Sequence, residues 1–195
     1  MPWYAYPWDG LEEAMQRERD PPFTVVGYGS LLNSYSARRT LSLDQSTLFP
    51  VISFGVKRVY NYKTPPEVLR RYGDLADPLA IACLNTQVTY RPQDAINGLT
   101  YVLKVEEVEA LRRREQGYDL VPVVSIDWHH PREVYVHYVL SAPDALRMGQ
   151  RWIAPGAKPL LAYDALCKQG ALSISEAFLA FFSKTTYLSD GITLI

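Results

Sequence analysis

Short apolar runs separated by turn residues fill the first three quarters of the chain. Each run has the length and the β-branched or aromatic content of a strand. The runs are Phe23–Val26, Val51–Tyr60, Leu79–Leu84, Ala95–Val105, Val121–Ile126 and Val134–Leu140. Because few long helices come between them, the pattern predicts an α+β fold around a small, mostly antiparallel β-barrel or a curved mixed sheet flanked by helices. The segments 34–50 and 65–77 are expected to be loop-rich, the former with a short helix.

The last third of the chain has the periodicity of helices. Pro159 suits a first helical position and Gly170 a stop, with apolar residues between them. Ser173 and Glu176 have the spacing of a capping box that opens a second helix. We therefore expect one domain over residues 23–195, in which residues 141–195 form a C-terminal helical extension.

An arm of residues 1–22 precedes this domain. It carries four aromatic residues and then a charged stretch, 12–20, that could form a helix. Apolar side chains seldom stay in water, so we expect the arm to fold back on the domain. A contact between two copies of the chain is the alternative.

A short helix is predicted from Val105 to Arg114, with Gly117 as its left-handed cap. Val105, Val108 and Leu111 share one stripe, and Glu115 falls on the same stripe. The other charged residues, Glu106, Glu107, Glu109, Arg113 and Arg114, are expected to point elsewhere. Burial and the negative helix end should both raise the pKa of Glu115, which suits a group that shuttles protons.

A structural alternative for Glu115 is an ordinary ion pair at the end of a helix. Arg112 lies three residues earlier, at a spacing that allows such a pair.

Composition limits the classes of function. The net charge of −1 and the absence of a basic block interleaved with aromatics argue against nucleic-acid binding. Cys83 and Cys167 are far apart, which argues against a metal site or a disulfide framework and fits a reducing compartment. The acidic N-terminus is not that of a signal peptide, and no apolar run is long enough to cross a membrane. We expect a cytoplasmic monomer or homodimer whose partners are small molecules.

The turn after the first strand contains the strongest functional signal, Gly27-Tyr28-Gly29-Ser30-Leu31-Leu32. Glycines at such a turn allow unusual backbone angles and close approach, and several N–H groups can then converge on an anion. A nucleophile elbow centred on Ser30 would need a glycine where Leu32 stands. A dinucleotide fingerprint lacks its third glycine in the same way. A tight turn with no further role is the remaining alternative.

The stretch Tyr28-Gly29-Ser30-Leu31-Leu32 resembles the YGSxL signature of the γ-glutamylcyclotransferase-like superfamily. The resemblance implies that Tyr28, Gly29, Ser30 and Leu31 bind the glutamyl part of a substrate.

Leu111, Glu115, Gly117 and Tyr118 match the family's helix and the glycine and tyrosine after it, so the resemblance implies that Glu115 is the catalytic acid/base. Arg112 stands where the family usually has aspartate, and Gln116 is inserted before the glycine.

Two further residues match more loosely. Tyr138 resembles a strand tyrosine that contacts substrate in some members, and Arg58 follows a strand glycine and is a candidate structural or site arginine. The matched region runs from Phe23 to about Leu140.

The resemblance implies a cyclotransferase-type lyase. It would convert a γ-glutamyl amide or peptide to 5-oxoproline and a free amine or amino acid, without a cofactor. Two alternatives remain open: a non-catalytic protein that binds a small molecule in the same cavity, and an interaction protein that uses the aromatic arm. His129, His130 and His137 lack the spacing of metal ligands, so we expect no metal site.

Overall fold

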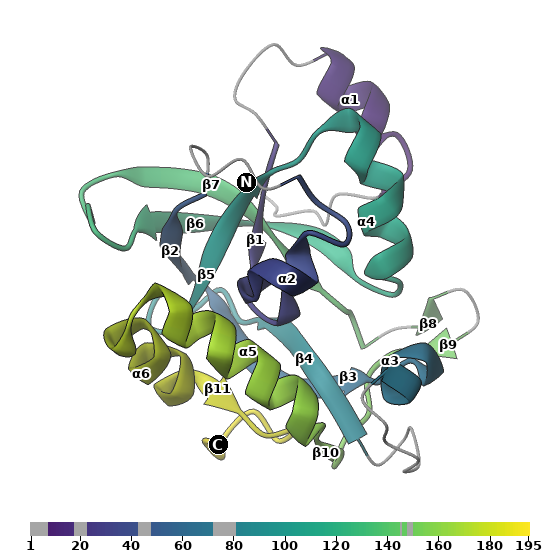
Figure 1. The fold of residues 1–195 in the computed structure, drawn as a ribbon, viewed down its shortest axis with the longest axis vertical. Coiled ribbons are helices and arrows are strands. Elements are labelled where there is room, and N and C mark those ends of the chain that lie inside the picture. Colours follow the sequence, from purple (N-terminus) through teal and green to yellow (C-terminus); the bar gives the residue numbers. More distant parts are fainter. Residues whose placement is uncertain (1–7, 18–22, 43–47, 72–80, 145, 148–149) are drawn as a thin grey trace.

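Five strands close into a barrel at the centre of the fold (Figure 1). Around the barrel they follow the order β1 (Thr24–Gly27), β5 (Ala95–Val102), β2 (Pro50–Phe54), β6 (Asp119–Asp127) and β7 (Val134–Ser141). Neighbouring strands are antiparallel except β1 and β7, whose parallel pairing closes the barrel. The predicted α+β fold with a mostly antiparallel barrel is confirmed.

This computed structural model describes residues 8–17, 23–42, 48–71, 81–144, 146–147 and 150–195. Trp3, Tyr4 and Tyr6 of the N-terminal arm lie outside the described residues, as does much of the segment expected to be a loop after Pro65.

A second sheet lies beside the barrel and contains β10 (Lys158–Pro159), β4 (Ile81–Val88), β3 (Val56–Lys63) and β11 (Thr186–Tyr187) in that order. The run 51–60, predicted as one strand, is divided between the two sheets. Gly55 separates β2 from β3 with a φ of +81°, a conformation that glycine adopts without strain. The outer strands β10 and β11 are parallel to their neighbours, so the C-terminal segment is part of this sheet.

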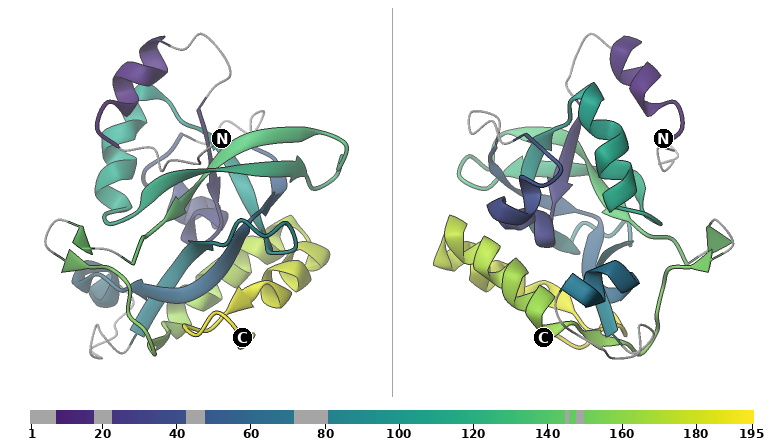
Figure 2. Two further views of the ribbon diagram at one scale, coloured as in Figure 1. Left: turned by 180° about the vertical axis from the view of Figure 1, so that it is seen from behind. Right: turned by 45° about the vertical axis from the view of Figure 1, so that its right-hand side comes forward.

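Helices cover the two sheets from different sides (Figures 1 and 2). The longest, α5 (Leu161–Ile174) and α6 (Glu176–Lys184), pack on each other beside the second sheet. At the other end of the molecule, α1 (Leu11–Arg17) lies next to α4 (Val108–Arg114), which follows a 3₁₀ turn, Val105–Glu107. The remaining short elements are a 3₁₀ turn Ser30–Leu32, α2 (Ser34–Ala37), α3 (Pro66–Arg71) and the hairpin β8 (Leu146–Arg147) and β9 (Gln150–Arg151).

Four local predictions near the helices are wrong. Gly170 does not end α5: a Cβ at this position would lie 2.6 Å from backbone atoms of residues 32 and 33, so the glycine lets α5 pack directly on that turn. Pro159 belongs to β10 rather than to the first turn of α5. The cap of α6 is Ser175, whose side chain accepts a hydrogen bond from the Phe178 N–H, and not Ser173. Finally, Pro66 begins α3 where a loop was expected.

Arg58 proves to be a fully buried structural residue. Its guanidinium donates to the Asn97 side chain at 2.9 Å and to Thr186 Oγ1 at 3.2 Å, and lies 4.1 Å from the ring centre of Phe182. Burial lowers the pKa of Arg58 to about 9. The side chain thus joins β3, β5 and the C-terminal helix α6 and is not a wall of the cavity described below.

Candidate active site

The turn after β1 combines an unusual backbone conformation with close packing. Gly29 has a φ of −123° and a ψ of −124°, outside the helical and extended regions, as expected of a glycine at this turn. A Cβ at Gly29 would lie 2.6 Å from the hydroxyl of Tyr163, and one at Gly27 would lie 2.5 Å from Leu31 Cβ. The two glycines therefore provide the space in which β1 turns directly into the 3₁₀ turn.

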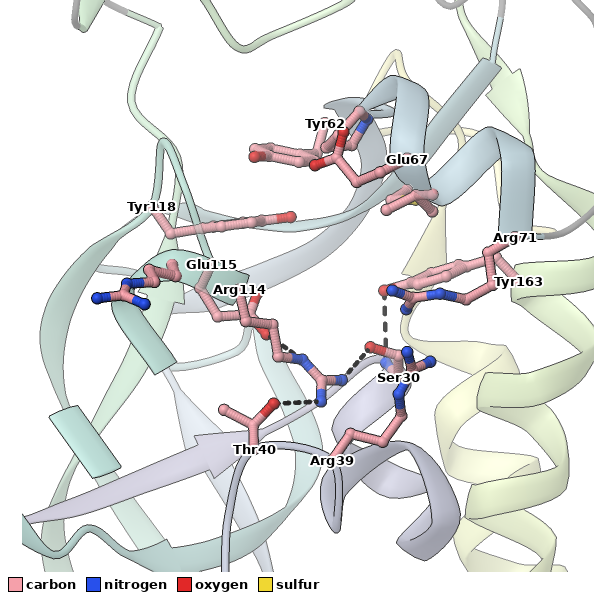
Figure 3. Close-up of a pocket in the computed structure, with 14 residues that line it drawn as sticks. Ser30, Arg39, Thr40, Tyr62, Glu67, Arg71, Arg114, Glu115, Tyr118 and Tyr163 are labelled. Carbon is pink, nitrogen blue, oxygen red and sulfur yellow. Dashed lines mark hydrogen bonds and ion pairs between the residues drawn. The ribbon is translucent and has the colours of Figure 1, made fainter. Parts of the chain in front are cut away.

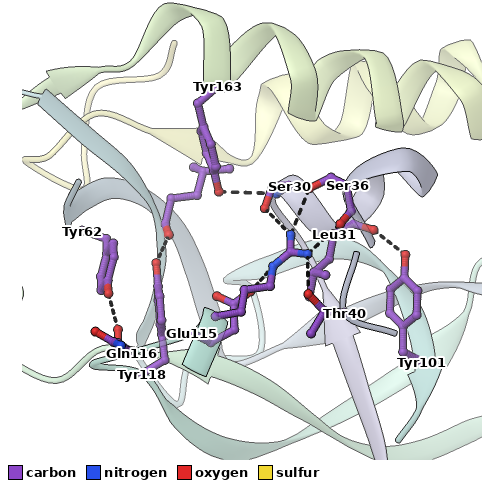
Figure 4. Close-up of polar contacts among 12 residues, drawn as sticks. Ser30, Leu31, Ser36, Thr40, Tyr62, Tyr101, Glu115, Gln116, Tyr118 and Tyr163 are labelled. Atoms are coloured by element: carbon purple, nitrogen blue, oxygen red, sulfur yellow. Dashed lines mark hydrogen bonds and ion pairs between the residues drawn. The ribbon is translucent and has the colours of Figure 1, made fainter. Parts of the chain in front are cut away.

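Two tyrosine hydroxyls hold this turn in place (Figure 4). The hydroxyl of Tyr101 donates to the Leu31 carbonyl, and the N–H of Ser30 donates to the Tyr163 hydroxyl at 3.4 Å. Tyr163 comes from α5, so this helix forms one wall beside the predicted binding turn.

The helix before Glu115 has the predicted buried apolar stripe, but Glu107, which was expected to point elsewhere, is buried too, and its carboxylate accepts a hydrogen bond from the Lys104 N–H at 3.0 Å. Val108 and Leu111 are buried, and the Glu115 N–H donates to the Leu111 carbonyl at 2.9 Å at the helix end. Gly117 has a φ of +81° and packs directly on the indole of Trp152. The predicted left-handed glycine after the helix is confirmed. The Glu115 side chain that precedes it is only 14% exposed.

Glu115 forms an ion pair with its neighbour Arg114, at 2.9 Å between Oε1 and Nε. The expectation that Arg114 points away is therefore wrong, because Glu115 is the C-cap residue and its backbone has left the helical conformation. The alternative partner, Arg112, pairs instead with Asp9 at 2.6 Å.

Arg114 also connects Glu115 to the turn after β1 (Figure 3). Its guanidinium donates to Ser30 Oγ at 3.0 Å, to the Ser36 carbonyl at 2.7 Å and to Thr40 Oγ1 at 3.2 Å. These bonds join two segments that are far apart in sequence. Arg114 thereby fixes the distance between the carboxyl group and the glycine-flanked turn.

Glu115 and Ser30 line the same open cavity, of about 270 Å³ (Figure 3). The cavity walls are rich in charged and aromatic side chains. They comprise the cations Arg39, Arg71, Arg113 and Arg114, the carboxylates Glu67 and Glu115, the tyrosines Tyr62, Tyr118 and Tyr163, and Ser30, Thr40, Pro65, Val68 and Cys83.

Burial decides the protonation of several groups in these walls. It raises the pKa of Glu115 above its ordinary value, as predicted, while the charge and hydrogen bonds of Arg114 limit the rise. Burial also raises the pKa of Tyr118 and Tyr163, which stay neutral. It raises the pKa of Cys83 to about 12, so this thiol is a poor nucleophile at neutral pH.

The predicted substrate-binding residues occupy different positions around this cavity. Ser30 lines it, and Gly29 abuts its wall residue Tyr163. Tyr28 and Leu31 are buried, and the Tyr28 hydroxyl donates to the Leu140 carbonyl at 2.6 Å. Tyr138 is not among the lining residues, and its ring stacks on Phe23 with 4.0 Å between centroids.

Sequence reasoning missed most of the charged wall. Arg39, Arg71 and Tyr163 come from α2, α3 and α5 regions with no shared spacing, so no sequence pattern connects them. Tyr118 carried a usable signal, because it directly follows the glycine of the recognised motif. Its hydroxyl donates to the Leu84 carbonyl at 2.6 Å.

The three histidines do not come together in one cluster. The N–H groups of His129 and His130 both donate to Asp127 at 2.7 Å in the turn after β6, whereas His137 is buried beside Phe49. Within the described ranges, no group of three or more His, Cys, Asp or Glu residues is placed to hold a metal ion. Nor does any helix in the part of the chain that the structure describes have the length and apolar character needed to span a membrane.

Comparison of sequences found no matching family model and no matching curated protein. Comparison of structures found solved proteins with a similar fold. A solved structure titled "Gamma-glutamyl cyclotransferase" has a TM-score of 0.57 at 12% identity, covering 85% of this chain and 86% of its own.

Two further solved structures are similar. YkqA from Bacillus subtilis also has a TM-score of 0.57 at 12% identity, covering 89% of this chain, which spans 56% of that longer protein. An uncharacterized protein from Homo sapiens has a TM-score of 0.53 at 14% identity, with coverage of 83% and 89%. The motif in the turn after β1 led us to expect the fold of this superfamily. The structural comparisons confirm that fold: this chain has the γ-glutamylcyclotransferase-like fold.

Proposed function

We propose that this protein is a cyclotransferase-type lyase that converts a γ-glutamyl amide or peptide to 5-oxoproline and a free amine or amino acid. The observation that carries the proposal is the meeting of Glu115 and Ser30 in one cavity. A carboxyl group that is only 14% exposed and has a raised pKa lies beside a turn that matches the family signature. The fold that this chain shares with a solved structure titled "Gamma-glutamyl cyclotransferase" supports the same proposed function.

The proposed substrate contains its own nucleophile. In a γ-glutamyl amide the α-amino nitrogen can attack the γ-carbonyl carbon and close a five-membered ring, so the protein need not supply a nucleophile. The cavity would hold the substrate in a folded conformation, with the α-carboxylate on the N–H groups of the turn from Tyr28 to Leu31. This proximity replaces the many conformations of a free chain with a near-attack geometry.

Proton transfer is the remaining chemical requirement. Glu115 takes a proton from the α-ammonium group, the new C–N bond forms, and negative charge develops on the carbonyl oxygen. The amide C–N bond then breaks as Glu115 returns this proton to the departing nitrogen, and the re-ionised carboxylate accepts the second proton that the ring nitrogen must lose, which then passes to the released amine or to solvent. A carboxyl group whose pKa lies nearer neutrality performs both transfers better than an ordinary surface glutamate.

One observation favours the alternative of a binding protein without catalysis. The ion pair with Arg114 occupies one oxygen of Glu115 and stabilises its charged form, as a purely structural pair would. In the catalytic proposal Arg114 acts as a positioning residue, which keeps Glu115 ionised and ready to accept the first proton.

The deciding experiment measures 5-oxoproline by mass spectrometry after incubation with γ-glutamyl peptides, γ-glutamyl amino acids and γ-glutamylamines. The proposal expects release of 5-oxoproline from at least one class, in equal amounts with the free amine. Binding of these compounds in calorimetry with no 5-oxoproline from any of them would instead establish the binding protein.

A further inference from the structure

Two arginines at the cavity rim have no electrostatic partner among the residues that the structure describes. Arg39 follows α2 and Arg71 ends α3, and both side chains are exposed. Within the described part of the chain, neither has a hydrogen-bond or ion-pair partner, whereas Arg113 pairs with Glu109 at 2.9 Å and Arg114 pairs with Glu115.

The rim therefore carries excess positive charge. The remaining carboxylate in the cavity wall, Glu67, is exposed and likewise has no ion-pair partner among the described residues. Counting partners among the described residues only, the rim holds two unpaired guanidiniums and one unpaired carboxylate. Such a rim attracts a ligand with a net negative charge.

The depth of the cavity determines which part of a bound substrate lies near the two rim arginines. Glu115 is 14% exposed and must contact the reacting bond, so the glutamyl part lies in the interior. Whatever is attached beyond the scissile bond then extends toward the exposed side chains. Figure 3 shows Arg39 and Arg71 beside Ser30 and Tyr163, on the side of the cavity away from Glu115.

We propose that Arg39 and Arg71 form a binding subsite for a carboxylate on the leaving group. This inference rests on the proposed function and narrows its substrate class to γ-glutamyl amino acids or peptides with a free carboxylate, as opposed to neutral γ-glutamylamines. A guanidinium donates two parallel hydrogen bonds to a carboxylate, which supplies direction as well as charge.

Charge balance supports the same substrate class. The glutamyl part alone is a zwitterion with no net charge, and an uncharged amine attached to it leaves the whole molecule neutral. An amino acid as the leaving group adds one carboxylate and makes the substrate a monoanion. This charge complements the single excess positive charge of the unpaired rim residues Arg39, Arg71 and Glu67.

The test compares two substrates that differ only in this charge, γ-glutamyl-alanine and γ-glutamyl-alaninamide. The proposal expects kcat/KM to be about tenfold higher for γ-glutamyl-alanine, the size expected of exposed and partly screened ion pairs. The preference should decrease with added salt, because salt screens exposed charges.

Variants of the protein assign the preference to residues. In Arg39→Gln and Arg71→Gln the ratio of the two kcat/KM values should fall about threefold each, consistent with one exposed ion pair. Arg38→Gln and Arg70→Gln are matched controls, because each removes the same charge from an adjacent exposed residue that does not line the cavity. The controls should keep the wild-type ratio.

The outcomes separate this inference from the proposed function. Release of 5-oxoproline from both substrates at equal kcat/KM would overturn the subsite and leave the lyase proposal intact. Equal losses on both substrates in the Arg39 and Arg71 variants would also overturn it, since the arginines would then bind the glutamyl carboxylate. If neither substrate turns over, calorimetry with the same pair decides: tighter binding of γ-glutamyl-alanine supports the subsite, and equal or absent binding refutes it.

Discussion

Replacing Glu115 with glutamine tests the proposed chemistry with the smallest change in shape. Glutamine keeps the side-chain length and an oxygen that can accept a hydrogen bond from Arg114, but it cannot exchange a proton. Any loss of activity in a correctly folded Glu115→Gln protein can then be assigned to proton transfer.

The structure allows the cost in stability to be bounded. The mutation converts one charge-assisted hydrogen bond, at 2.9 Å, to a neutral one, while Arg114 keeps its bonds to Ser30, Ser36 and Thr40. The difference between charged and neutral hydrogen bonds is about 1 kcal/mol, so the free energy of unfolding should change by no more than about 1.5 kcal/mol.

The expected loss of activity is much larger. General acid–base catalysis contributes about 10²- to 10⁴-fold, and here one group performs both proton transfers, so kcat should fall toward the larger figure. Release of 5-oxoproline gives kcat and KM, denaturant unfolding gives stability, and calorimetry gives substrate affinity. Glu106→Gln is the matched control, because it removes an exposed carboxylate from the turn that begins the same helix.

Two results would refute the reasoning. A Glu115→Gln protein that retains more than about a tenth of wild-type kcat would show that another group moves the protons, since acid–base catalysis is worth at least about a hundredfold. Loss of activity in Glu106→Gln to the same extent would show that the effect comes from the net charge of this region.

Three further predictions concern the site and the barrel. Arg114→Gln removes the cation that lowers the pKa of Glu115, so the acidic limb of the pH profile of kcat/KM should move to higher pH; an unmoved limb would contradict the pairing. Gly29→Ala places a methyl group 2.6 Å from the Tyr163 hydroxyl and should cost about 1–3 kcal/mol in denaturant unfolding, part of which Tyr163→Phe should restore in the double variant. Burial lowers the pKa of His137 to about 4, so between about pH 6.5 and pH 4 the unfolded chain binds an extra proton and stability falls by about 2–3 kcal/mol as pH falls. His137→Phe should lose less stability than wild type over this range, and an equal loss would assign the acid sensitivity to other groups.

Local sequence patterns were sufficient for much of the fold. The strands β1, β4, β5, β6 and β7 were recognisable because β-branched and aromatic residues cluster between turn residues. The helix before Glu115 was recognisable because Val108 and Leu111 recur at helical spacing, and Gly117 marked its end. Errors arose where long-range packing overruled such patterns, as at Gly170, where a missing side chain serves a contact between segments.

The sequence by itself determined that Glu115 falls on the buried stripe of its helix, since this follows from contacts between residues close along the chain. Only the tertiary structure decided how β1 and β7 close the barrel, that Arg114 joins Glu115 to Ser30, and that Arg39 and Arg71, with no partner among the described residues, flank the cavity. The reason is physical: these features depend on contacts between distant segments, whose energies come from packing and charge in three dimensions. No spacing along the chain encodes them.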